Sequence, residues 1–150
     1  MTFRAALAGW LAARNIGQDD AMDLGLFIVR LFLGVPFIIW GIGKLRGGDA
    51  KIAPMIAQMG VPDPKLMALM VALCETAGGL MVVMGWPLRM AALLLGLWCL
   101  LTGYLEHRGN LTEFLKNVTM AGGFFALVVM GGGTLALFGG AAPGILGWLP

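Results

Sequence analysis

The sequence contains little charge. Of its 150 residues, 10 are Lys or Arg and 8 are Asp or Glu, so 12% are charged while 59% are hydrophobic. Soluble domains have about 25% charged and about 45–50% apolar residues, because polar side chains must cover their surface. Eighteen charges are too few for that, and a mean hydropathy of +0.89 agrees. The composition therefore excludes a soluble globular domain and indicates a single integral membrane domain over residues 1–150.

Other absences narrow the classes of function. The net charge of +2 is small and scattered, so no basic patch for nucleic acid is expected. The chain has one His and two Cys, without a Cys-x-x-Cys spacing, so we predict no metal site and find no thiol-oxidoreductase motif. Cys74 and Cys99 each fall near the middle of an apolar segment, where free thiols behave mainly as small hydrophobic groups.

Four apolar segments are long enough to cross a bilayer as helices. A hydrocarbon core needs about 20 mostly apolar residues per helix, and no segment shows the alternation of a barrel strand. The segments are residues 24–43, 66–85, 88–105 and 117–138. We therefore predict an all-α fold, an integral membrane four-helix bundle.

Capping residues mark several helix ends. Asp63 followed by Pro64 is typical of an N-cap and a first-turn proline for the second span. Asn110 with Glu113 resembles a capping box before the fourth span. Pro36 lies inside the first span and is expected to kink it.

The segments outside the spans are expected to lie at the membrane surface. For residues 1–23 we predict a short interfacial helix anchored by Trp10, in preference to a signal peptide. Residues 50–59 are too short to span and are predicted to form an interfacial or partly re-entrant turn. Residues 139–150 carry no charge and form a tail.

The distribution of Lys and Arg predicts the orientation. Positive residues accumulate in cytoplasmic loops. Six lie in the loops between spans one and two and between spans three and four, whereas three lie on the other side. We predict a multi-pass protein of the bacterial inner membrane with both termini in the periplasm.

Two charged residues, Arg30 and Glu75, lie well inside the predicted spans. A lone charge at mid-bilayer costs at least about 2.5–3.5 kcal/mol, and these two have opposite signs on adjacent helices. We predict an Arg30–Glu75 salt bridge facing the bundle interior. The pair either fixes the helix register alone or forms a proton or quinone-headgroup site, with Glu75 as proton acceptor and Arg30 as its electrostatic partner.

A second polar cluster is expected at the inner boundary. Its members are Lys44, Glu106, His107, Glu113, Lys116 and Asn117. His107 is the only histidine and can take up protons near neutral pH, although a His at a helix end is more often solvated or a cap.

The order of these polar residues and glycines resembles the DoxX family of small four-helix bacterial membrane proteins. The matching pieces lie between residues 24 and 138 and include Arg30-Leu-Phe-Leu-Gly34, Gly41-Ile-Gly-Lys44, Glu75-Thr-Ala-Gly78-Gly79, His107 and Lys116-Asn117. The resemblance implies the bundle and a redox role, because relatives are subunits of a quinol oxidase and of thiosulfate:quinone oxidoreductase. It makes five residues the candidates for binding a quinone cofactor: Arg30, Lys44, Glu75, His107 and Asn117.

Three functions stay open at this point. The first is a quinone-linked subunit of a membrane redox complex, with Glu75 and Arg30 as the catalytic pair and a partner protein required for activity. The second is a non-catalytic anchor or assembly subunit. The third is a transporter or channel, which would need a homo-oligomer because four helices leave little room for a pore in one copy.

Overall fold

The computed structural model describes residues 3–107 and 109–137, which are helical apart from short turns and the segment after the last helix. Its elements are α1 (Phe3–Gly43), the π-helical turn η1 (Lys44–Gly48), α2 (Asp49–Gln58), α3 (Pro64–Met84), α4 (Leu88–His107) and α5 (Leu111–Met130). Four helical stretches are long and apolar enough to cross a membrane: Gly17–Gly47, α3, α4 and α5. The predicted all-α membrane bundle is confirmed.

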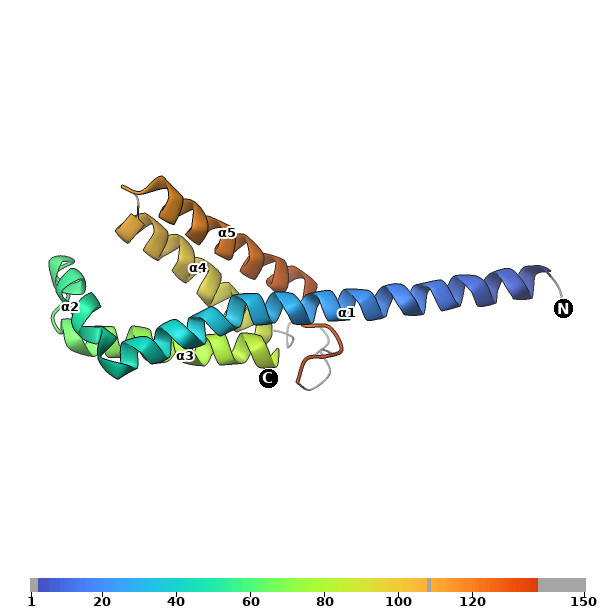
Figure 1. Ribbon diagram of the computed structural model, residues 1–150, viewed down its shortest axis with the longest axis horizontal. Helices are drawn as coiled ribbons and strands as arrows, with labels where there is room; N and C mark the ends of the chain where they lie inside the picture. The colour runs from blue at the N-terminus through green and yellow to red at the C-terminus, as the bar shows by residue number, and fades with distance from the viewer. Residues whose placement is uncertain (1–2, 108, 138–150) are drawn as a thin grey trace.

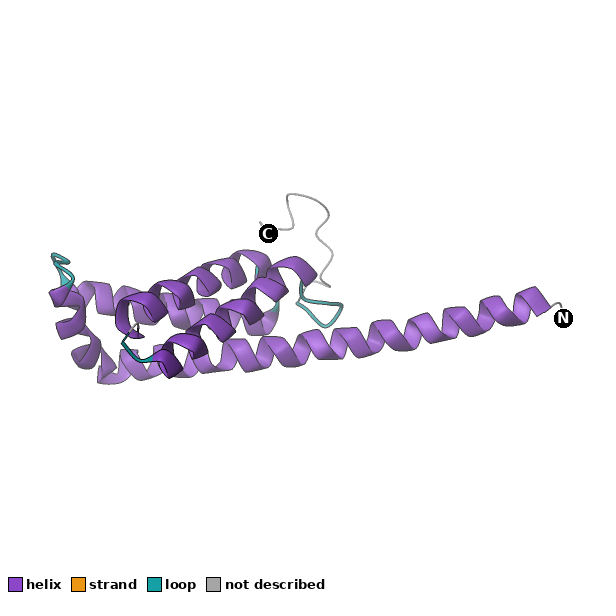
Figure 2. Ribbon diagram, turned by 90° about the horizontal axis from the view of Figure 1, so that it is seen from above, coloured by secondary structure: helices purple, strands orange, loops and turns teal. Residues whose placement is uncertain are grey.

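The bundle consists of two helix pairs. α1 packs mainly against α3, and α4 packs mainly against α5. Figure 1 shows the two pairs close together near the turn between α3 and α4 and further apart toward the end that carries α2. Viewed from above, all four long helices run roughly along one direction (Figure 2). The bundle therefore has a closed end and an open end.

Glycines set the register between α1 and α3. A Cβ atom on Gly34 would lie 2.7 Å from the carbonyl oxygen of Gly79, and a Cβ on Gly79 would lie 2.7 Å from that of Gly34. Small residues allow such close backbone approach in membrane bundles. Because the two helices are antiparallel and touch at these glycines, residues before Gly34 lie beside the C-terminal end of α3.

The predicted caps are present, but α5 differs from the expected span. Asp63 accepts a hydrogen bond from the backbone N–H of Leu66 at 3.0 Å, and Asn110 accepts one from that of Glu113 at 3.3 Å. Because Asn110 caps it, α5 begins at Leu111 and not at residue 117. It ends at Met130 and not at residue 138, since Gly131 adopts a φ of 80° that favours glycine.

The segments outside the predicted spans also differ from expectation. α1 is one helix of 41 residues that continues through Pro36, so residues 3–23 prolong the first span along its axis, beyond the bundle (Figure 1), and do not form a separate interfacial helix. Residues 50–59 belong largely to the short helix α2, which packs beside α3. The side chain of Trp10 and the tail 139–150 lie outside the described part of the chain.

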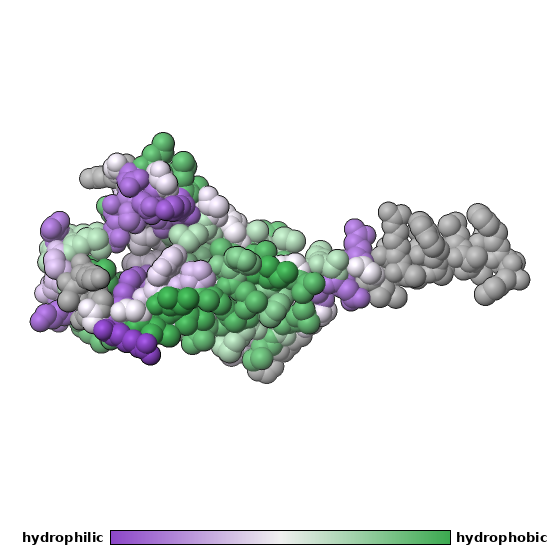
Figure 3. All heavy atoms as spheres, viewed as in Figure 1, coloured by the Kyte–Doolittle hydropathy of each residue, from purple (hydrophilic) through white to green (hydrophobic). Residues whose placement is uncertain are grey.

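The outer surface of the bundle is apolar. Large hydrophobic side chains are exposed on every long helix, among them Phe32 at 78% and Val129 at 79%. Figure 3 shows hydrophobic residues along the bundle and hydrophilic residues gathered toward the end that carries α2 and where α1 leaves the bundle at the other end. This distribution suits helices that face lipid along their length and water at their ends.

Candidate functional site

Glu75 of α3 lies at the centre of a polar cluster formed by three helices. The Lys44 ammonium Nζ lies 2.6 Å from Glu75 Oε1 and 2.5 Å from Oε2. The indole N–H of Trp98 on α4 donates a hydrogen bond to Oε1 at 3.1 Å. Glu75 is 5% exposed. The carboxylate therefore joins η1, α3 and α4 within an apolar bundle, where a buried charge needs such partners.

The predicted Arg30–Glu75 salt bridge is wrong. Arg30 donates instead to two backbone carbonyl oxygens, that of Val83 at 3.3 Å and that of Leu135 at 2.9 Å. Val83 lies eight residues beyond Glu75, which is about 12 Å along α3. The register between α1 and α3 thus places Arg30 too far from Glu75, and Lys44, expected outside the span, reaches back into it along its flexible stem.

Arg30 has a structural role at the closed end. Its side chain is fully buried, and its guanidinium carbon lies 5.4 Å from the ring centre of Phe27. A Cβ on Gly85 would collide with the guanidinium, so the absence of a side chain there makes room for it. The segment after α5 is held at the same place, because the N–H of Leu137 donates to the Met84 carbonyl at 2.8 Å. Arg30 therefore ties α1, the end of α3 and residues 131–137 together.

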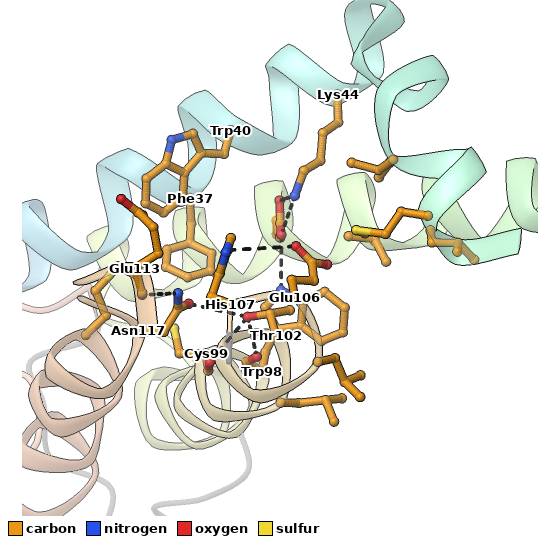
Figure 4. Close-up of a pocket in the computed structure, with 18 of the residues that line it drawn as sticks. Phe37, Trp40, Lys44, Trp98, Cys99, Thr102, Glu106, His107, Glu113 and Asn117 are labelled. Carbon is orange, nitrogen blue, oxygen red and sulfur yellow. Dashed lines mark hydrogen bonds and ion pairs between the residues drawn. The ribbon is translucent and has the colours of Figure 1, made fainter. Parts of the chain in front are cut away.

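A cavity of about 800 Å³ lies at the open end. Its walls come from all the helices and include Glu75. Lys44 and Trp98 also form part of them (Figure 4). The apolar lining is Phe37, Trp40, Ile52, Met55, Ile56, Met59, Val61, Met67, Val71, Leu101, Leu105 and Met120. This composition, largely apolar with a few polar groups, is typical of a site for a small organic molecule.

The second polar cluster predicted from the sequence lines the same cavity. Figure 4 shows His107, Glu106, Glu113 and Asn117 around it. His107 Nε2 lies 3.9 Å from Glu106 Oε2. The Asn117 amide donates to the Glu113 carbonyl oxygen at 3.0 Å, and its own Oδ1 lies 3.4 Å from the Thr102 hydroxyl. The cavity thus joins a buried carboxylate to polar groups near the expected membrane boundary.

Four of the five residues singled out from the sequence therefore meet at one cavity, namely Lys44, Glu75, His107 and Asn117, and Arg30 does not. Two contributors were missed. Trp98 could have been found, because an indole N–H in the middle of a span needs a hydrogen-bond partner. The side chains of α2 could not, since only the chain's reversal at η1 brings them over the cavity.

Comparison with known proteins identifies the family to which this fold belongs. Residues 25–108, which include Arg30, Lys44, Glu75, Trp98 and His107, match the DoxX family model. The chain belongs to the DoxX family. The resemblance found in the sequence is thereby confirmed.

Two relatives in this family are inner membrane proteins of Escherichia coli (strain K12). The chain is 34% identical over 120 residues to "Inner membrane protein YqjF", covering 77% of this chain and 90% of that protein. It is 31% identical over 122 residues to "Inner membrane protein YphA", covering 75% and 86%. These names agree with the predicted membrane location, while the orientation of the termini stays a prediction.

A more distant relative has a name that refers to oxidoreductase activity. The chain is 27% identical over 80 residues to "Putative oxidoreductase CatD" of Bacillus subtilis (strain 168), covering 53% of this chain and 58% of that protein. No solved structure is significantly similar to the chain.

Proposed function

We propose that this DoxX protein is the membrane subunit of a redox complex and that its cavity binds the headgroup of a quinone. One observation carries the proposal: a largely apolar cavity of about 800 Å³ holds a buried carboxylate bound to an ammonium and an indole. Sites for small organic ligands have volumes of about 300–1,000 Å³ and a few convergent polar groups. The redox name of the Bacillus relative supports the same class of function.

The lining suits the chemistry of a quinone ring. The ring is flat and apolar, with two carbonyl oxygens that accept hydrogen bonds. Phe37 and Trp40 offer aromatic walls, with ring centres 5.4 Å apart. The Lys44 ammonium, the Trp98 N–H and the Asn117 amide are hydrogen-bond donors on three different helices. A ring that enters the cavity therefore has donors available from more than one side.

The buried carboxylate supplies the proton chemistry. Reduction of a quinone adds two electrons and two protons, which convert both carbonyl oxygens to hydroxyl groups. A partner redox protein provides the electrons. Glu75 takes up a proton from the membrane boundary, where His107 lines the same cavity, and passes it to a carbonyl oxygen; the second proton follows by the same route. Lys44, and not Arg30, is the electrostatic partner that compensates the charge of Glu75.

An anchor or assembly subunit is the second candidate, and the shape of α1 favours it. This helix extends beyond the bundle (Figure 1), and residues 17–20 at the start of its described surface are exposed. A helix that projects from a membrane bundle can hold a soluble redox partner. The two functions are compatible, because a quinone-binding subunit must also hold the protein that supplies its electrons.

Fluorescence quenching tests the quinone site. Quinones quench nearby tryptophans, so titration of a short-chain quinone into the purified protein in nanodiscs should give saturable quenching. Trp98→Phe removes one of the two cavity indoles, the other being Trp40, together with the hydrogen bond to Glu75, and should lower both the quenched fraction and the affinity. Trp86→Phe removes an indole outside the cavity lining and serves as the matched control. Quenching that does not saturate, or that is equal in both variants, would overturn the proposal.

A further inference from the structure

A second, smaller groove lies where α1 and η1 meet the first turns of α3. Its volume is about 290 Å³. The lining residues are Lys44, Leu45, Lys65, Leu66, Leu69 and Ala72. Both polar members are lysines, and no acidic side chain is among them. The three leucines are between 40% and 53% exposed, so the apolar part of the groove faces the surroundings of the bundle.

The groove lies at the end of two membrane spans. Lys44 directly follows the last residue of α1, and Lys65 is in the first turn of α3. Arg46 on η1 is exposed nearby in the chain. One groove thus combines positive charge at the membrane boundary with leucines along the adjoining span.

The two lysines differ in how they are paired. Lys44 is bound to Glu75 on the side of the large cavity. Within the described residues, the Lys65 ammonium has no ion-pair partner. The groove therefore has an uncompensated positive charge, and the ligand that complements it is an anion with an apolar part.

We infer that this groove binds an anionic membrane phospholipid. Its phosphate lies against Lys65 and Lys44, and the first part of an acyl chain lies on Leu45, Leu66 and Leu69. Basic residues near a membrane surface attract anionic lipids, and grooves between helices with basic residues at the boundary bind their headgroups. The inference does not depend on the quinone proposal, because it rests on a different groove.

Native mass spectrometry of the full chain released from detergent tests the inference. Phosphatidylglycerol and phosphatidylcholine with the same acyl chains are titrated, and the dissociation constant of the first bound lipid is measured. Phosphatidylglycerol should bind more tightly. Lys65→Gln should weaken its binding about fivefold and bring it close to phosphatidylcholine, whereas Lys65→Arg should retain it. Lys116→Gln, which removes an exposed lysine outside this groove, is the control and should leave binding unchanged.

Three outcomes would overturn the inference. The first is equal affinity for the two lipids. The second is unchanged phosphatidylglycerol binding in Lys65→Gln, since the groove would then not hold the headgroup. The third is displacement of phosphatidylglycerol by millimolar inorganic phosphate, which would identify the groove as a site for the free ion.

Discussion

The closed and open ends of the bundle each hold a buried charged side chain, and different kinds of partner bind it at each end. At the closed end, Arg30 is bound by backbone carbonyl oxygens, which cannot move without shifting the main chain. At the open end, Glu75 is bound by the side chains of Lys44 and Trp98, which can change rotamer. The partners of Arg30 leave its buried Nε without a hydrogen bond, whereas those of Glu75 include an opposite charge, and only Glu75 has a cavity beside it. Fixed partners therefore suit a structural role, and exchangeable ones suit a site.

The largest expected effect is on stability at the closed end. Arg30→Ala removes a fully buried side chain and leaves two carbonyl oxygens without their donor. We expect the free energy of unfolding to fall by about 3–5 kcal/mol. Lys44→Ala is the matched truncation at the open end, where Trp98 still donates to Glu75 and water in the cavity can solvate the carboxylate, so it should cost less than about 2 kcal/mol. Reversible unfolding in mixed micelles measures both, and equal losses would contradict the distinction between the two ends.

The next effect is on activity at the open end. Glu75→Gln keeps the size of the side chain and an oxygen that can accept from Trp98, but it removes the group that carries protons. Quinone turnover by the assembled redox complex should fall by about 100-fold, while the variant still assembles with its partner. Turnover and co-purification are measured on the same preparation. Full turnover with full assembly would refute the proton role, and a turnover that follows assembly alone would favour the anchor function.

The predicted parts of this structure are those that local sequence dictates. Apolar runs of about 20 residues predicted the four spans. Asp63 and Asn110 predicted two helix starts, because each side chain accepts a hydrogen bond from the backbone N–H three residues further on. The partner of Glu75 could not be found in this way. It depends on the register between α1 and α3, which Gly34 and Gly79 set by contact between segments far apart in the chain.

Two other features differ from the sequence-based prediction. Residues 131–138 were predicted to belong to the fourth span, whereas Gly131 adopts a positive φ and ends α5, and Gly133 beyond it also has a positive φ. The cavity could not be predicted from the sequence, because it arises where the two helix pairs separate. The types of the site residues were thus predictable, and their grouping was not.

A double-mutant cycle tests which basic residue is coupled to Glu75, and the expected change in stability is smaller. If Lys44 is the partner of Glu75, the stability changes of Lys44→Met and Glu75→Gln should be non-additive by about 1–3 kcal/mol. The same cycle with Arg30→Met and Glu75→Gln should be additive within about 0.5 kcal/mol, because these residues are about 12 Å apart along the bundle and share no partner. A coupling energy between Arg30 and Glu75 would instead support the salt bridge predicted from the sequence.

The smallest effect is expected at the cavity's outer polar group. His107 lines the cavity near Glu106, but its side chain is 36% exposed, so water can replace it in part as a proton donor. His107→Gln should therefore slow quinone turnover only about twofold to fivefold, far less than Glu75→Gln. A proton donor that water can replace contributes less to the rate than a buried donor that water cannot reach. Added imidazole should restore the rate of His107→Gln and leave that of Glu75→Gln low. If imidazole rescues neither variant, or the histidine variant is as slow as Glu75→Gln, protons do not reach the carboxylate from this boundary.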